Sequence, residues 1–359
     1  MAHPEARDLD QTQHDLAAWL RRRLPQAREV RIDNLHSPST TGFSSDTLLF
    51  DLHWSDAAAT HDESLVVRFK PRGFVVFPSY DVGLQFRVMQ ILGERTDVPV
   101  PRMRWNEPDA AALGSPFYVM DKVNGLILSD MPPYHSGGWF TELSPEARAH
   151  MWWSGLEAMT RIHRLDWRAL GFDFLADPAR GATPVAQQLH YYDEFISWGM
   201  ERHRYPLIEA VQAWLHAHQP ADEPVALCWG DARPGNQIFD SQLNCIAVID
   251  WEMARLGDPV QDLAWWIILD RCMSEGIGIE RLPGFPSRED TIARWEALVG
   301  RPARNVPYYE VLGLYKFAII MARVSLQMKH YEILPPDNDM DVNNLASVTL
   351  EKAFAAVAR

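Results

Sequence analysis

The stretch Leu227–Asp240, LCWGDARPGNQIFD, is an apolar run that ends in a turn carrying an Asp, an Arg, a Gly and an Asn. A run that resembles a buried strand normally ends in a plain turn. A second apolar run, CIAVIDWE (Cys245–Glu252), follows closely and delivers another Asp. Because two short strands in a hairpin meet at one rim, we expect Asp231, Asn236 and Asp250 to lie together.

These residue types at this spacing suit phosphoryl transfer. That reaction needs a carboxylate to orient the attacking hydroxyl, oxygen ligands for Mg²⁺, and a cation near the nucleotide phosphates. Mg²⁺ takes one or two carboxylate oxygens and fills the remaining positions with phosphate and water. Asp231 is the candidate base, and Asn236 and Asp250 are the candidate metal ligands.

Composition limits the class of protein. The 359 residues carry a net charge of −14, with 47% hydrophobic and 23% charged residues, which is ordinary for a soluble globular chain. Proteins that bind nucleic acid non-specifically carry a surplus of Lys and Arg, so we expect no nucleic-acid partner. The acidic balance would favour encounter with a cationic substrate.

Cysteine usage and apolar runs indicate the compartment. The three cysteines, Cys228, Cys245 and Cys272, are odd in number and lack CxxC spacing, which argues against disulfides and a structural zinc site. The N-terminal residues include early acidic groups and no apolar signal region. The apolar run LAWWIIL is far too short to span a membrane. We therefore expect a reduced, cytoplasmic protein without a membrane partner.

The first third of the chain has the pattern of strands around one helix. TLLFDLHW and SLVVRFK alternate apolar and polar residues, and the polar stretch between them predicts a hairpin. SYDVGLQFRVMQIL has helical spacing, and SPFYVMDKVNG predicts a strand closed by an Asn-Gly turn. The chain then becomes mostly helical, beginning with a helix capped by Ser144 and Pro145. The pattern predicts a small β-rich lobe followed by a larger helical lobe, with a hinge near Met120–Gly125.

Taken together, these segments resemble the aminoglycoside-phosphotransferase-like kinases, which include choline kinases. The family pattern is H-G-D-x-x-x-x-N, then a strand ending in Asp-Trp/Phe-Glu, then G-D-x-x-x-D-L-A. Here it reads CWGDARPGNQIFD, CIAVIDWE and GDPVQDLAW. TTGFSSDTLLFD, LVVRFKP and FYVMDKVNG match the nucleotide loop, the phosphate-binding strand and the hinge. The nearest branch is bacterial, without established antibiotic resistance, and is related to kinase domains fused to acyl-CoA dehydrogenases.

The resemblance implies an α+β, two-lobed protein-kinase-like fold, with an N-terminal nucleotide-binding lobe (1–120) and a C-terminal catalytic and substrate-binding lobe (121–359). It implies that Asp231 is the base, that Asn236 and Asp250 bind Mg²⁺, and that Asp262 supports the catalytic loop. The nucleotide, ATP or GTP, would meet residues of the N-terminal lobe and hinge, namely Gly42, Ser44, Ser45, Arg68, Gln85, Met120 and Lys122.

The sequence departs from the family pattern at three positions. Trp229 stands where the family has a His, a change expected to alter packing rather than abolish catalysis. The phosphate-binding Lys is replaced by Arg68, with Lys70 as the alternative, and Arg is not equivalent to Lys. Its acidic partner on the helix corresponds to Gln85, which supplies no countercharge.

Several side chains also have plainer readings. Asp258 precedes a Pro at a helix start, which favours a capping role. His163 lies on an apolar helix face and is expected to be a satisfied core histidine. Arg233 is equally consistent with a phosphate or substrate contact and with a surface ion pair.

The function expected from these observations is Mg²⁺-dependent transfer of a γ-phosphate from ATP or GTP to a hydroxyl of a small molecule. Two alternatives remain open. One is a kinase of lipophilic hydroxyacyl substrates rather than of aminoglycosides, and the other is a nucleotide-binding pseudokinase that serves as a scaffold.

Overall fold

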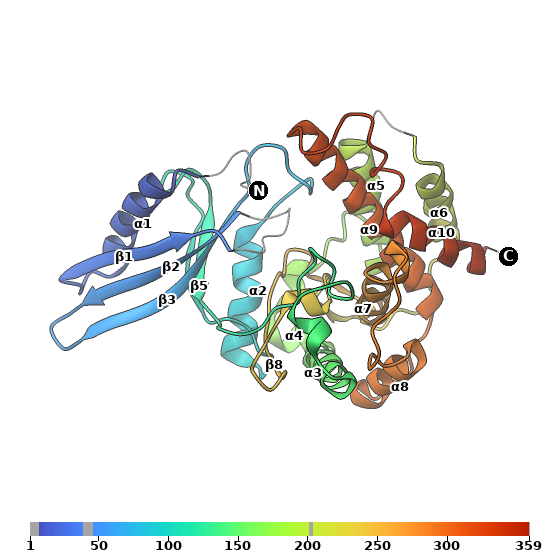
Figure 1. Ribbon diagram of the computed structural model, residues 1–359, viewed down its shortest axis with the longest axis horizontal. Coiled ribbons are helices and arrows are strands. Elements are labelled where there is room, and N and C mark those ends of the chain that lie inside the picture. The colour runs from blue at the N-terminus through green and yellow to red at the C-terminus, as the bar shows by residue number, and fades with distance from the viewer. Residues whose placement is uncertain (1–6, 39–45, 201–203, 359) are drawn as a thin grey trace. The chain divides into compact units, whose positions relative to one another are not determined.

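The computed structural model describes residues 7–38, 46–200 and 204–358, and the chain divides into two compact units (Figure 1). The first unit comprises Met1–Glu94 and Pro101–Val123, and the second comprises Arg95–Val100 and Asn124–Arg359. The short segment Arg95–Val100 belongs to the second unit because its polar groups bond there. Arg95 donates to the carbonyls of Ala169 and Leu170, and the carbonyl of Pro99 accepts from Val248 N.

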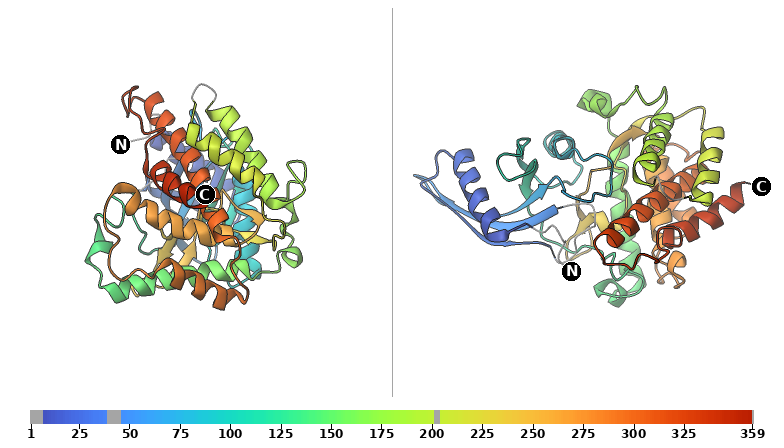
Figure 2. Two further views of the ribbon diagram at one scale, coloured as in Figure 1. Left: turned by 90° about the vertical axis from the view of Figure 1, so that its right-hand side faces the viewer. Right: turned by 90° about the horizontal axis from the view of Figure 1, so that it is seen from above.

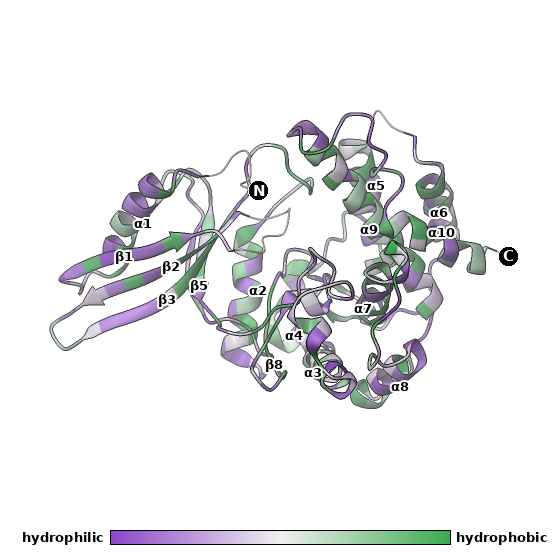
Figure 3. Ribbon diagram, in the orientation of Figure 1, coloured by the Kyte–Doolittle hydropathy of each residue, from purple (hydrophilic) through white to green (hydrophobic). Residues whose placement is uncertain are grey.

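In the described part of the first unit, the strands form one antiparallel sheet in the order β1-β2-β3-β5-β4. The strands are β1 (Glu29–His36), β2 (Asp46–Ser55), β3 (Thr60–Phe69), β4 (Met103–Glu107) and β5 (Phe117–Asp121). Figure 3 shows hydrophilic and hydrophobic residues alternating along β1, as the period of two in a strand requires when one face is buried. The hairpin predicted between β2 and β3 is confirmed.

Helices cover the two faces of this sheet. Phe117 and Val119 of β5 point into an apolar core with Trp19 of α1 (Leu9–Arg23). Tyr118, between them, points to the opposite face and meets α2 (Val82–Arg95), where its hydroxyl donates to Gln85 Oε1 at 3.3 Å.

Helix α1 and strand β1 correct the expectation of strands around a single helix in this third of the chain. The helix has an apolar stripe that includes Leu16, Trp19 and Leu20, and this stripe supplies part of the sheet's core. Its termini carry ordinary signals, an Asp8 cap that accepts from Gln11 N and arginines in the last turn.

The second unit is mainly helical with short strands (Figure 2). Its helices of four or more residues are η1 (Trp139–Glu142), α3 (Pro145–His163), α4 (Trp167–Leu170), η2 (Phe172–Leu175), α5 (Pro184–Gly199), α6 (Pro206–Ala217), α7 (Val260–Cys272), α8 (Arg288–Val299), α9 (Val306–His330) and α10 (Leu345–Val357). The predicted start of α3 is confirmed, since Ser144 Oγ accepts from Ala147 N and Pro145 is the first helical residue.

Helix α7 is the central element of the second unit. Every residue of α7 except Arg271 is buried, as expected of a helix surrounded by other elements. Helix α9 packs along α7. By length and composition, α9 is the one helix among the described residues that could cross a membrane. Yet 67% of its most apolar 18-residue window is buried inside the protein. That burial is typical of a core helix.

The short strands of the second unit pair differently from the expected hairpin. Strand β6 (Ala226–Cys228), which precedes Asp231, pairs with β9 (Arg255–Gly257), whereas β8 (Cys245–Val248) pairs with β7 (Gln237–Phe239). The reason is local, because the Asp240 side chain accepts from Gln242 N and Asn244 N and closes a tight turn between β7 and β8.

Candidate functional site

The loop that follows β6 packs closely against the backbone of Met253 and is hydrogen-bonded to the carboxylate of Asp262. Gly230 has φ 93° and passes so close to Met253 that an added Cβ would lie 2.1 Å from the Met253 carbonyl oxygen. This position therefore requires glycine. The N–H groups of Trp229 and Gly230 donate to the two oxygens of Asp262, at 2.6 and 3.0 Å. The geometry agrees with the supporting place expected for Asp262.

Asp262 is itself positioned by a buried histidine. Trp295 Nε1 donates to His163 Nδ1 at 3.0 Å, so the imidazole proton must lie on Nε2, which faces Asp262 Oδ2 at 3.1 Å. His163 is buried with both ring nitrogens bonded, so the expected satisfied core histidine is confirmed. Its place behind Asp262 was not foreseen, because no local pattern links a residue in α3 to one in α7.

The Asp231 carboxylate accepts three hydrogen bonds. Trp265 Nε1 donates to Oδ1 at 2.8 Å, and Asn236 Nδ2 and Arg233 Nε donate to Oδ2 at 2.6 and 3.3 Å. Burial raises the pKa of Asp231, the Arg233 charge opposes that rise, and the nearby Asp250 carboxylate adds to it. Sequence reasoning did not place Trp265 against Asp231, although Trp265 lies one helical turn after Asp262.

Asn236 and Asp250 come together through the β7–β8 hairpin. Asn236 lies in the 3-10 turn η3 (Pro234–Asn236) immediately before β7, and its backbone carbonyl accepts from Ile249 N at 3.0 Å. Asp250, the next residue, has φ 61°. A non-glycine residue in this left-handed region is uncommon, although Asp and Asn adopt it more readily than other residues, and such residues concentrate at functional sites.

Trp229 takes over a structural role at the family's His position. Its indole Nε1 donates to the carbonyls of Ile249 and Asp250, at 2.9 and 3.3 Å. The side chain is fully buried and lies against Trp251, with ring centroids 6.2 Å apart. The substitution thus ties the loop that bears Asp231 to the backbone that bears Asp250.

Arg233 forms an ion pair that leads to the rim of the site. Its Nη1 donates to both oxygens of Asp130, at 2.6 and 2.7 Å, in addition to the contact of Nε with Asp231. Asp130 belongs to a segment with exposed apolar side chains, Leu126, Ile127 and Met131, of which Met131 is 70% exposed. The ion pair expected as one reading of Arg233 is present, but it is mostly buried, with the Arg233 side chain 18% exposed. The other reading, a phosphate or substrate contact, stays a prediction.

The donor set suits a hard divalent cation. Asn236 uses its Nδ2 on Asp231, which leaves its amide oxygen as the ligand-type atom, and Asp250 supplies a carboxylate. Within residues 7–38, 46–200 and 204–358 no group of three or more His, Cys, Asp or Glu side chains could hold a metal. Two protein oxygens completed by phosphate and water are what Mg²⁺ needs in nucleotide sites, so the residues fit Mg²⁺.

The candidate nucleotide residues of the first unit lie on β3, β5 and α2. Arg68 is 7% exposed and is opposite Tyr118 in the sheet, the residue that bonds Gln85, whereas Lys70 is exposed. Met120 pairs with Val66, and Lys122 N donates to Ser64 O at 2.9 Å. Gly42, Ser44 and Ser45 lie outside the described residues.

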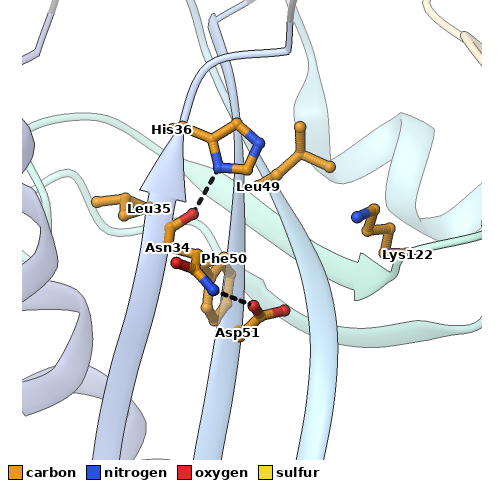
Figure 4. Close-up of a pocket in the computed structure, with 7 residues that line it drawn as sticks. All are labelled: Asn34, Leu35, His36, Leu49, Phe50, Asp51 and Lys122. Atoms are coloured by element: carbon orange, nitrogen blue, oxygen red, sulfur yellow. Dashed lines mark hydrogen bonds between the residues drawn. The ribbon is translucent and has the colours of Figure 1, made fainter.

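A cavity of about 380 Å³ lies beside Lys122 in the first unit (Figure 4). Its lining residues come from β1, from β2 and from the residue that follows β5, and they are Asn34, Leu35, His36, Leu49, Phe50, Asp51 and Lys122. Asn34 Nδ2 and Ser64 Oγ donate to Asp51 at 2.7 Å each, and these bonds lower the pKa of Asp51. The sequence offered no signal for this cavity.

A mostly buried carboxylate on a loop, bonded to an amide and near a second carboxylate, is typical of phosphotransferases of the kinase-like class. The order of a β lobe and a mainly helical lobe fits the same class. The model of the phosphotransferase enzyme family matches residues 42–290, and the chain belongs to that family.

Relatives and solved structures agree with this assignment. A probable acyl-CoA dehydrogenase of Arabidopsis thaliana, IBR3, is 28% identical over 312 residues, which are 82% of this chain and 37% of that protein. The chain thus spans about a third of that relative. The crystal structure of a putative aminoglycoside phosphotransferase from Ralstonia eutropha has a TM-score of 0.67 at 22% identity, covering 95% of this chain and 98% of the other.

The GDP and kanamycin complex of an aminoglycoside 2″-phosphotransferase has a TM-score of 0.56 at 15% identity, covering 95% and 99% of the two chains. The predicted α+β, two-lobed kinase-like fold is confirmed by these likenesses.

Proposed function

We propose that this phosphotransferase moves the γ-phosphate of ATP or GTP to a hydroxyl of a small molecule, with Asp231 as the base. The observation that supports this proposal most strongly is the Asp231 carboxylate, which accepts hydrogen bonds from Trp265, Asn236 and Arg233. The amide oxygen of Asn236 and the carboxylate of Asp250, the candidate metal ligands, belong to the same site. The nucleotide of the structural neighbour supports the choice of donor.

Each side chain has a separable task in this reaction. Asp231 accepts the proton of the attacking hydroxyl, and its three hydrogen bonds fix the direction in which it does so. Arg233 places a positive charge next to that carboxylate. Asp262 fixes the loop through the N–H groups of Trp229 and Gly230. Positioning of this kind supplies much of the catalysis in phosphoryl transfer.

Asn236 and Asp250 would hold Mg²⁺. When bound, the ion supplies positive charge that offsets the negative charge of the phosphates. Arg68, rather than the exposed Lys70, is the side chain that we assign to the phosphates, because its buried place on β3 matches the family's phosphate-binding strand. The cavity beside Lys122 would receive part of the nucleoside. The three free cysteines are consistent with action in the cytoplasm.

A lipophilic acceptor is the second candidate, and the segment around Asp130 favours it. Exposed apolar side chains there, Leu126, Ile127 and Met131, flank the carboxylate that pairs with Arg233. Apolar side chains at the rim of a site favour a ligand with an apolar chain. The relative named as a probable acyl-CoA dehydrogenase supports an acyl group in the acceptor. The net charge of −14 instead favours a cationic aminosugar.

Transfer of labelled γ-phosphate from ATP and GTP to both acceptor types tests the proposal. The panel holds aminoglycosides and hydroxyacyl thioesters. Asp231→Ala should lower kcat by at least about 10²-fold, because general-base help is worth that much, while nucleotide affinity stays within about threefold. Asp222→Ala, at an exposed carboxylate before β6, is the control. Equal turnover by the wild type and Asp231→Ala contradicts the base assignment, and binding without any transfer favours the pseudokinase.

A further inference from the structure

Lys316 is a buried lysine that the proposed reaction does not use. It lies in α9 and is 3% exposed. Lysine is almost never fully buried unless a specific partner compensates the loss of water. The side chains around its ammonium group therefore need an explanation.

Those surroundings lead directly to the catalytic loop. Lys316 Nζ lies 4.8 Å from the centre of the Trp265 ring and 5.9 Å from that of Tyr192. A cation over an aromatic face within about 6 Å is attracted by the ring, and most strongly by Trp. The same Trp265 indole donates its N–H to Asp231 Oδ1 at 2.8 Å.

The titratable groups that act on the ammonium come from several elements. Arg255 of β9 repels it, whereas Asp262 of α7, Asp231 of the loop and Cys228 of β6 favour its charged form. Burial and Arg255 prevail, and they lower the pKa of Lys316 to about 7. The lysine is thus a cation below pH 7, carries about half its charge at pH 7, and is neutral at higher pH.

We propose that Lys316 is a positioning residue for the Asp231 carboxylate, and that it acts through the indole of Trp265. The ammonium group fixes the ring, and by drawing electron density from it strengthens the N–H that Trp265 donates. It also adds positive charge near a carboxylate that has little access to water. The predicted effect of Lys316 on the reaction rate rests on the proposed function. The contacts of Lys316 with Trp265, and of Trp265 with Asp231, do not depend on it.

The test compares Lys316→Met with Lys329→Met across pH 6–9. Methionine has a similar length and suits a buried site, so the variant should fold. Lys329 is a matched control on the same helix, where it pairs with Asp341 at 2.8 Å instead of a ring. The readout is the indole ¹H–¹⁵N resonance of Trp265, assigned from its loss in Trp265→Phe, together with kcat for phosphate transfer.

In the wild type and in Lys329→Met, the Trp265 resonance should titrate with a midpoint near pH 7. In Lys316→Met the ¹H chemical shift of the Trp265 indole N–H should be lower, as expected for a weaker hydrogen bond, and it should not change with pH. The variant's kcat should be about tenfold lower at pH 6.5, with an unchanged KM for the nucleotide and no basic limb near pH 7. A wild-type resonance that does not respond to pH, or a Lys316→Met profile equal to that of the wild type, overturns the proposal.

Stability gives a readout that is independent of catalysis. The pKa of Lys316 is near 7 in the folded chain and 10.5 in the unfolded chain, so the unfolded chain binds the extra proton between these values. The stability of the wild type relative to Lys316→Met should therefore rise from pH 7 to about pH 10. The unfolding constant should fall by up to about tenfold per pH unit in this range, and the difference between the two proteins should be constant below pH 7. A constant difference from pH 7 to 10 contradicts the buried titrating lysine.

The two proposals fail separately. If no phosphate is transferred but the Trp265 resonance titrates in the wild type and not in Lys316→Met, the contact stands and the proposed function is lost.

Discussion

At the scale of single residues, Trp229 shows how a departure from the family pattern keeps the site intact. A His is usual at this position, and the sequence alone suggested only altered packing. The indole N–H instead donates to the carbonyls of Ile249 and Asp250. These bonds hold the peptide groups on both sides of Asp250, whose φ is positive. Without such support the backbone at Asp250 would relax to a more common conformation.

Trp229→Phe tests this role because it removes the N–H and keeps the ring. Two partly buried carbonyls lose a donor, which should cost about 1 kcal/mol of stability. We expect faster hydrogen exchange at the amides around Asp250 and about tenfold weaker binding of the nucleotide with Mg²⁺.

Trp167→Phe is the control, because that indole donates to Val225 O at 3.0 Å, away from Asp250. The assignment of Trp229 is wrong if the two variants change nucleotide affinity equally.

At the scale of elements, the N-terminal turn of α7 organises the site. Asp262 is 1% exposed and accepts from Trp229 N, Gly230 N and His163 Nε2. Asp258 was expected to cap this helix, but the N-cap position is Pro259, and the Asp258 side chain accepts instead from the first helical amide, Val260 N, at 3.0 Å. A helix start thus holds both its own first turn and the loop that bears the base.

Asp262→Ala should destabilise the chain by about 3–5 kcal/mol, since three buried donors lose their acceptor. Asp258→Ala, which frees one N–H, should cost about 1–2 kcal/mol. Urea denaturation at pH 7 measures both. Equal costs for the two variants would show that Asp262 does not hold the loop.

The pairing of the short strands and the tertiary contacts of the loop could not be predicted from the sequence. The motif spacing predicted that Asp231, Asn236 and Asp250 would converge, but not that β8 would pair with β7 rather than with β6. Pairing depends on which turn closes, and Asp240 closes the nearer one. The contacts of Trp265 and His163 at the site were not predicted because each reaches the loop through tertiary packing, which no local spacing encodes.

At the scale of the whole molecule, the order of a β lobe and a helical lobe was readable from the periods of the apolar residues. Helix α1 was not recognised, because the polar residues of its outer face mask the stripe of Leu16, Trp19 and Leu20. The cavity beside Lys122 also depends on how three strands align, which appears only in the folded sheet. The fold does not determine which acceptor molecule is used, and our proposal assigns that choice to the segment around Asp130.

Calorimetric titration of ATP, and then of GTP, with and without Mg²⁺ tests directly whether the chain binds a nucleotide through Mg²⁺. The variant is Asp250→Asn, because Asn tolerates the positive φ of this position and removes only the charge. We predict nucleotide binding that depends on Mg²⁺ and is weakened at least about tenfold in Asp250→Asn. Absence of binding of either nucleotide to the folded wild-type protein would contradict the account.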